Sequence, residues 1–194
     1  MQYTYRKLTL ENWDDFQQLF QKHKGVRGGC WCAYYLGRPK DFVFSEKERH
    51  REIHHEHVRT FGSTGIIMYE ADLPIGYCQV AKFPIIERFD YAKGYERLPD
   101  EVKTQKDWRI SCIFVDKDRR KRGLASKLFD FALEHIADSG GGMLEVFPFD
   151  HQSPPANSFT FNGSVAFYTK RGFERIAPIG TSSILMRKFI QPAR

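Results

Sequence analysis

The stretch Asp118-Arg-Arg-Lys-Arg-Gly-Leu-Ala125 decides the fold of this chain. It follows an apolar run with strand character, Ile110-Ser-Cys-Ile-Phe-Val115, and precedes an amphipathic run over 124–137 with helical spacing. A strand, a basic glycine-bearing turn and a helix hold phosphates well, because the turn's N–H groups and the positive end of the helix face the same anion. The sequence therefore predicts a phosphorylated ligand at this turn.

The composition is that of one globular domain, and we expect it to span residues 1–194. Of the 194 residues, 41% are hydrophobic and 28% are charged, which suits a packed core and argues against disorder. The chain has no run of about 18 apolar residues and no apolar signal core. Four cysteines are too few for a disulfide scaffold. These features favour a cytoplasmic protein with reduced thiols and no membrane partner.

The net charge of +6 has two interpretations. One is a basic nucleic-acid-binding regulatory module, because basic grooves lined by aromatic rings bind single strands. The other is attraction of an anionic ligand. Arg119, Arg120, Lys121 and Arg122 concentrate the charge at the predicted phosphate turn, and no motif interleaves basic and aromatic residues. We therefore expect no nucleic-acid partner.

Periodicity and turn residues predict an alternating α/β order with a mixed sheet. Helical spacing of Trp13, Phe16, Leu19 and Phe20 marks the first helix, and Ser45 is the expected cap of the second. Strands are expected at 3–9, 65–70, 75–81, 108–115, 143–147, 173–177 and 182–190, helices at 11–24, 45–61, 124–137 and 163–170, and a loop at 150–160. The polar, irregular stretch 83–107 is an insertion, either a lid or specificity loop or a surface insertion without a catalytic task.

Two motifs in this order resemble the GNAT superfamily of acyl-CoA-dependent N-acyltransferases. Arg120-x-x-Gly123-x-Ala125 matches the family's pyrophosphate turn, and Ser164-Val-Ala-Phe-Tyr168-Thr-Lys-Arg-Gly172-Phe173 looks like its last helix and turn. The chain departs from the family at Phe161, which stands at the usual Asn position with Asn162 one residue later, and at Ser164, which replaces the usual Ala. The segments Gly29-Cys-Trp-Cys32, Gly76-Tyr-Cys-Gln79 and Glu145-Val-Phe-Pro148 also resemble a poorly characterised GNAT subgroup.

The resemblance implies a mostly antiparallel central sheet of six to seven strands flanked by helices, with a splay between the two central strands. It implies acetyl-CoA as co-substrate and transfer of its acetyl group to a primary amine by direct attack in a ternary complex. The acceptor would be a small-molecule or peptide amine, and a homodimer is compatible with the family. The alternative within the family is a CoA-binding protein without catalysis.

By the same resemblance, the cofactor lies along the strand before the turn and on the turn itself. An N–H group near Phe114 would polarise the thioester carbonyl. The implied cofactor-binding residues are Ile113, Phe114, Val115, Arg120, Lys121, Arg122, Gly123, Leu124, Ala125, Ser164 and Phe167.

Two residues are candidates for proton transfer. Tyr168 matches the family's general acid, the alternative being a core tyrosine at the helix end. The acceptor amine must be neutral to attack, so a base or a desolvating pocket is needed. Glu145 is the preferred base, with Glu70 as second candidate; Glu145 could instead face solvent or pair with Arg109.

The segment Cys30-Trp31-Cys32 is expected to line the acceptor pocket, because the stretch between the first two helices borders that pocket in GNAT proteins. Two cysteines without a second pair do not make a structural zinc site. His50, His54 and His57 have helical spacing, yet no Cys or Asp nearby in sequence completes a metal site, and a solvated helix face is the preferred interpretation. We expect no metal.

Overall fold

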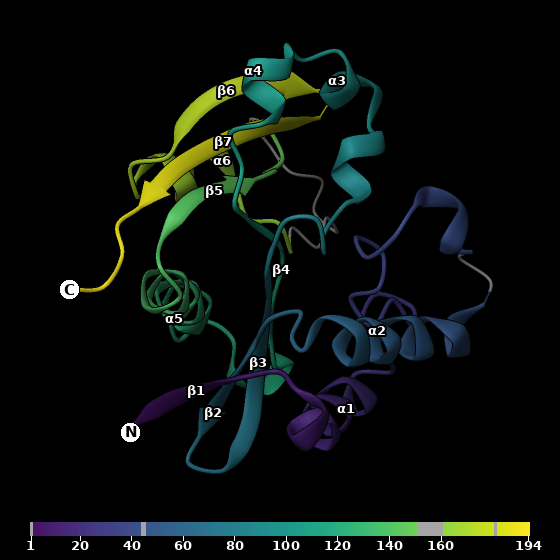
Figure 1. The fold of residues 1–194 in the computed structure, drawn as a ribbon. Coiled ribbons are helices and arrows are strands. Elements are labelled where there is room, and N and C mark those ends of the chain that lie inside the picture. The colour runs from purple at the N-terminus through teal and green to yellow at the C-terminus, as the bar shows by residue number, and fades with distance from the viewer. Residues whose placement is uncertain (1, 44–45, 151–160, 181) are drawn as a thin grey trace.

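A computed structural model of the protein describes residues 2–43, 46–150, 161–180 and 182–194. The predicted cap Ser45 and nearly all of the predicted loop 150–160 lie outside these residues. Seven strands form one sheet in the order β1-β2-β3-β4-β5-β7-β6 (Figure 1). They are β1 (Tyr3–Lys7), β2 (Ile66–Glu70), β3 (Leu73–Lys82), β4 (Trp108–Val115), β5 (Gly142–Val146), β6 (Glu174–Ile179) and β7 (Ser183–Ile190). All neighbours are antiparallel except β4 and β5, which are parallel.

Helices cover both faces of this sheet, so the chain has the predicted mixed α/β fold. The helices are α1 (Trp13–Lys22), α2 (Lys47–Phe61), α3 (Lys93–Glu96), α4 (Asp100–Lys103), α5 (Leu124–Asp138) and α6 (Val165–Thr169). Short 3₁₀-helices occupy Leu10–Asn12, Pro39–Asp41, Arg88–Tyr91 and Lys117–Arg119. Figure 1 shows α5 on one side of the sheet and α1 and α2 on the other. Among the described residues, none of the helices is both long and apolar enough to cross a membrane.

A hydrophobic core lies on each face of the sheet, where the apolar face of a helix packs against the strands. Leu128, Phe129, Ala132 and Ile136 of α5 are fully buried in a cluster with one face of the sheet. On the opposite face, the four apolar positions expected on the first helix are all buried in α1. Periodicity therefore predicted which face of each helix packs on the sheet, because burial of the apolar stripe is what stabilises such helices.

The insertion 83–107 has more structure than the sequence indicated. It contains one 3₁₀-helix, α3 and α4, and Figure 1 shows these short helices beside β6 and β7. Phe89 and Tyr95 from the insertion share a third core with Phe147 and Leu185 of the sheet region. The insertion therefore covers the half of the sheet face that α1 and α2 leave open.

The two central strands part after a short contact. β4 pairs with β5 only at Trp108–Leu144, Arg109–Glu145 and Ile110–Val146. From residue 111 onward β4 has no partner in β5, while its other edge stays paired with β3 as far as Val115. The sheet thus has an opening between β4 and β5, just before the basic turn.

Candidate active site

The basic turn after β4 is an open, exposed loop. Asp116 starts it by accepting a hydrogen bond from the N–H of Asp118 at 3.0 Å. Lys121 and Gly123 then take left-handed conformations, with φ of 62° and 73°, and α5 begins at Leu124 without a side-chain cap. A Cβ added to Gly123 would meet no atom within 4 Å. The first turn of α5 therefore presents its N–H groups to open space, which suits an anion.

The charged side chains around this turn fall into two groups. Arg119 pairs with Glu70 at 2.8 Å, so the second candidate base is held in an ion pair. Lys22 pairs with Asp116 at 2.8 Å. By contrast, the predicted phosphate ligands from Arg120 to Gly123 are exposed, as is Ala125. Leu124 is buried in the core beneath α5, so only its main chain can face a ligand.

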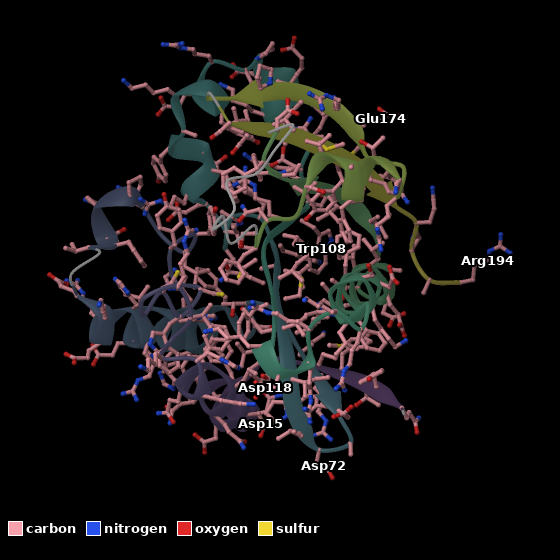
Figure 2. All side chains as sticks on the ribbon, turned by 180° about the vertical axis from the view of Figure 1, so that it is seen from behind. Asp15, Asp72, Trp108, Asp118, Glu174 and Arg194 are labelled. Carbon is pink, nitrogen blue, oxygen red and sulfur yellow. The ribbon has the colours of Figure 1, made fainter. Side chains whose placement is uncertain are left out.

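The opening exposes the backbone of alternate β4 residues. The N–H of Asp116 bonds to Ile75, next to β3, whereas the N–H of Ile113 points the other way and bonds to the carbonyl of Phe161 at 2.8 Å. Because N–H groups alternate along a strand, Ile113 and Val115 face the opening and Phe114 faces β3. The N–H of Phe114 itself therefore points to β3, and the N–H groups near it that face the opening are those of Ile113 and Val115. Figure 2 labels Trp108 and Asp118, which mark the start of β4 and the turn beyond its end.

A cavity of about 210 Å³ lies where β4 leaves β5. Ser111 and Cys112 of β4 form its floor, and the loop between α1 and α2 forms one wall. Its lining consists of Val26, Arg27, Gly28, Cys30, Cys32, Tyr34, Tyr35, Phe42, His50, Ser111, Cys112, Phe149, Phe161 and Asn162. Cys30 and Cys32, two of the three residues predicted to line an acceptor pocket, thus line this cavity. Trp31 does not line this cavity, because its ring turns away and stacks on Phe20 at 5.8 Å between centroids.

The loop wall has an unusual backbone. Every residue from Lys24 to Cys32 except Cys30 has a positive φ, although only three of these residues are glycines. Such conformations cost energy and persist only where the surroundings enforce them. Two buried histidines of α2 provide that constraint: His50 Nδ1 lies 2.8 Å from the Gly29 carbonyl, and His54 Nδ1 lies 2.6 Å from the Trp31 carbonyl.

The preferred interpretation of these histidines as a solvated helix face is therefore wrong for His50 and His54. Their side chains are 2% and 0% exposed. Burial lowers the pKa of His54 to about 3, so the imidazole is neutral. Its Nδ1–H then donates to Trp31, and its Nε2 accepts from the hydroxyl of Thr64 at 2.7 Å.

Gln79 connects the loop to the sheet. Its amide nitrogen donates to the carbonyl of Cys32 at 2.8 Å, and its amide oxygen accepts from the hydroxyl of Ser111 at 2.6 Å. Two of the segments that suggested a GNAT subgroup, 29–32 and 76–79, therefore meet at the cavity. Cys32 Sγ also lies 3.0 Å from Cys112 Sγ, and burial raises the pKa of the Cys32 thiol. Within the described part of the chain, no three Cys, His, Asp or Glu side chains gather to hold a metal.

Glu145 lies outside the cavity lining, and its carboxylate is enclosed. Arg109 Nε donates to Oε2 at 2.9 Å, Arg187 Nε donates to Oε1 at 3.1 Å, and the hydroxyl of Tyr95 lies 3.1 Å from Oε1. The sequence left pairing with Arg109 open as the alternative to a general base, and the geometry shows that pairing. Both of its oxygens accept hydrogen bonds from buried donors, and Glu145 is not among the described residues that line the cavity.

Tyr168 also points away from the cavity lining. Its ring is fully buried beside Phe129 and Phe173, and its hydroxyl donates to the carbonyl of Asn162 at 2.9 Å. Burial raises the pKa of the phenol. The other two predicted contacts of this motif lie nearby: Ser164 caps α6 by accepting from the N–H of Phe167 at 3.3 Å. The motif as placed here builds the turn that leads into α6.

Tyr35 and Asn162 are cavity residues that the sequence did not single out. The amide nitrogen of Asn162 donates to the hydroxyl of Tyr35 at 2.9 Å and so joins the loop wall to the segment before α6. A sequence signal was present, because Tyr35 follows the Gly-Cys-Trp-Cys segment closely and Asn162 adjoins the family's Asn position. Their spacing of 127 residues hid the contact.

Comparison with known proteins agrees with this geometry. An acetyltransferase (GNAT) domain model matches residues 62–175. No curated protein matches the chain. A solved putative GNAT acetyltransferase from Desulfovibrio desulfuricans is 16% identical, with a TM-score of 0.57 and coverage of 97% of this chain and 99% of that one.

Two further solved structures have the same fold. Arylalkylamine N-acetyltransferase 2 from Aedes aegypti is 14% identical, with a TM-score of 0.57 and coverage of 98% of this chain and 100% of that one. PaiA N-acetyltransferase from Thermoplasma acidophilum, solved with coenzyme A, is 12% identical, with a TM-score of 0.53 and coverage of 97% and 99%. At these identities the structures show a shared fold, and the domain model covers more than half of the 194 residues. The chain belongs to the GNAT acetyltransferase family.

Proposed function

We propose that this protein transfers an acetyl group from acetyl-CoA to a primary amine by direct attack within a ternary complex. The observation that carries the proposal is the parting of β4 and β5 between an exposed anion-binding turn and a cavity. The turn could hold the donor's diphosphate, and the cavity could hold the acceptor. The opening lies between the two, as transfer between both ligands requires.

The donor's binding residues are the main chain of the turn and the open edge of β4. N–H groups from Arg120 to Ala125 and the exposed Arg120, Lys121 and Arg122 side chains suit a diphosphate. Ile113 and Val115 offer main-chain groups to the pantetheine arm, and Ile113 would exchange its bond to Phe161 for one to the ligand. When bound, acetyl-CoA supplies an acyl group activated as a thioester.

The cavity can supply a neutral amine without a general base. Its described lining contains no Asp or Glu, and both nitrogens of His50 lie within hydrogen-bond distance of main-chain carbonyls, Gly29 at 2.8 Å and Val43 at 2.9 Å. Desolvation in a cavity whose described lining has no carboxylate disfavours an ammonium ion, because burial stabilises the uncharged form of an amine. The cavity is therefore the desolvating pocket that was the alternative to a base.

Tyr35 is the phenol best placed to donate a proton. It lines the cavity, and its hydroxyl is paired with the Asn162 amide: it accepts from Nδ2 at 2.9 Å and donates to Oδ1 at 3.3 Å, the longer bond being the one that the phenol would exchange for a ligand. Burial raises the pKa of Tyr35, which keeps the phenol protonated at neutral pH. We propose Tyr35, in place of Tyr168, as the donor to the departing sulfur.

Thermal melting with acetyl-CoA tests the proposal first. A ligand at 100 times its dissociation constant stabilises a protein by about 2.7 kcal/mol, and no shift at millimolar acetyl-CoA would count against any CoA-dependent activity. Release of the CoA thiol across an amine panel then tests catalysis. Binding without release would support the CoA-binding alternative.

Tyr35→Phe should lower kcat by at least tenfold, whereas Tyr91→Phe, a control on the insertion surface, should not.

A further inference from the structure

The cavity has a positively charged side chain in its lining and no negatively charged one among the described residues. Among its described lining residues, Arg27 is the only Lys, Arg, Asp or Glu. The residues that the structure does not describe include no Asp or Glu: 1 is Met, 44–45 are Phe-Ser, 151–160 are His-Gln-Ser-Pro-Pro-Ala-Asn-Ser-Phe-Thr, and 181 is Thr. Every Asp and Glu of the chain is therefore a described residue, and none of them lines this cavity.

Four of those carboxylates are held in ion pairs. Asp90 lies 2.6 Å from Lys106 Nζ, Asp116 lies 2.8 Å from Lys22 Nζ, and Asp150 lies 2.7 Å from Arg175 Nη2. Glu145 is shared by two arginines, as described above. An ammonium group entering the cavity would find no carboxylate among its described lining residues, and neither would a second cationic group on the same molecule.

A second cation stands behind the cavity wall. The guanidinium of Arg88 lies 4.0 Å from the centre of the Tyr34 ring, and its buried Nη1 has no hydrogen-bond partner. At the mouth, Arg27 is close enough to Cys30 and Tyr35 to act on both groups, opposing the larger pKa rise that their burial causes. Arg27 is exposed, so its guanidinium can reach a ligand at the entrance.

We infer that the cavity takes an acceptor that carries an anionic group, a carboxylate, bound by Arg27, and that it rejects polyamines. A carboxylate matches the guanidinium fork and gains a charge-assisted hydrogen bond there. A polycation meets like charge at Arg27 and finds no carboxylate among the described lining residues. That the bound molecule is an acetyl acceptor rests on the proposed function. The preference of the cavity for an anionic group over a cationic one does not.

Isothermal calorimetry with matched small molecules tests the inference by binding alone. The probes are L-phenylalanine, 3-phenylpropionate, phenethylamine and spermidine, of which the first and third differ only by a carboxylate. We expect the two carboxylates to bind at least tenfold more tightly than phenethylamine, and spermidine to show no binding. Arg27→Gln should remove this preference and Arg27→Lys should keep part of it. Lys24→Gln, which removes a cation from the same loop outside the cavity lining, should leave it unchanged.

The inference is overturned if phenethylamine or spermidine binds as tightly as the carboxylates, if no probe binds at millimolar concentration, or if Arg27→Gln keeps the preference. These results are separable from the proposed function. Acetyl-CoA that binds and is cleaved while carboxylates fail to bind refutes the inference and leaves the transferase standing. Carboxylate binding without any response to acetyl-CoA refutes the transferase and leaves an anion-selective cavity.

Discussion

The hydroxyl of Tyr168 donates to the main-chain carbonyl of Asn162 across 2.9 Å, and no part of the side chain is exposed. The family motif points to this tyrosine as an acid, but an acid must reach the departing sulfur. Here the phenol instead fixes the turn Asn162–Gly163, where a Cβ on Gly163 would come within 2.8 Å of the Tyr168 ring. Its local contacts fit a structural role, and Tyr35 takes the position on the cavity wall.

Tyr168→Phe separates these two roles. Loss of one buried hydrogen bond should lower the free energy of unfolding by about 1 kcal/mol, with about 1–3 kcal/mol if the Asn162 carbonyl stays unpaired. Urea unfolding measures that change, and steady-state assays should show kcat lowered by less than tenfold. A fall of about 100-fold in kcat with unchanged unfolding would instead restore Tyr168 as the acid.

His54 makes the stability of the protein depend on pH. Its pKa is about 3 in the folded state and about 6.5 when unfolded, because burial disfavours the imidazolium. The unfolded chain binds the extra proton first, so stability is complete above pH 6.5 and falls as the pH drops toward 3. The slope from this residue approaches about 1.4 kcal/mol per pH unit.

Unfolding of wild type and His54→Gln between pH 8 and pH 4.5 measures this effect. The wild type should lose about 2 kcal/mol more than the variant between pH 6.5 and pH 5, as the slope requires. Burial lowers the pKa of His23 and His135 too, but both residues remain in the variant, so the difference isolates His54. Parallel curves for the two proteins would contradict the assignment.

At the scale of elements, helix α2 holds the loop 24–32 in a conformation that the loop would not keep without it. The left-handed residues of 24–32 are stable because the carbonyls of Gly29 and Trp31 accept hydrogen bonds from His50 and His54, which lie one helical turn apart. The cavity wall formed by this loop is therefore supported by a helix that lies outside the sheet. Strand β4 performs the equivalent task on the other side, since it supplies both the floor of the cavity and the open edge.

The turn between β4 and α5 offers a sharp test of donor binding. Gly123→Glu places bulk and negative charge where we propose the diphosphate, so the thermal shift given by acetyl-CoA should disappear. Gly62→Glu is the control, because Gly62 also caps a helix, at the C-terminal end of α2, has φ of 79° against 73° for Gly123, and has open space around its Cβ position. Both variants carry similar backbone strain, about 1–2 kcal/mol. An acetyl-CoA shift retained in Gly123→Glu would remove the turn from the donor site.

For the whole molecule, local patterns predicted the elements and long-range partners remained hidden. The apolar spacing of α1 and α5 and the strand–turn–helix of 108–138 are readable because neighbouring residues set them. Glu145 shows the limit: its partners Arg187 and Tyr95 lie 42 and 50 residues away, in the last strand and in the insertion. Sequence periodicity does not predict contacts between residues so far apart in the chain. A glutamate that acts as a base therefore cannot be told from an ion-paired glutamate by sequence alone.

Glu145→Gln therefore tests how the insertion is joined to the sheet. Removing the charge leaves Arg109 and Arg187 buried with less compensation, and breaking a buried pair costs about 3–5 kcal/mol. Arg109 also bonds to the Ile86 carbonyl at 2.7 Å, so the insertion should loosen with it. Urea unfolding should show the loss, and limited proteolysis should cut within 83–107. Glu174→Gln, an exposed neighbour on β6, should change neither. A stable, protease-resistant Glu145→Gln protein that has lost its turnover would instead make Glu145 the catalytic base.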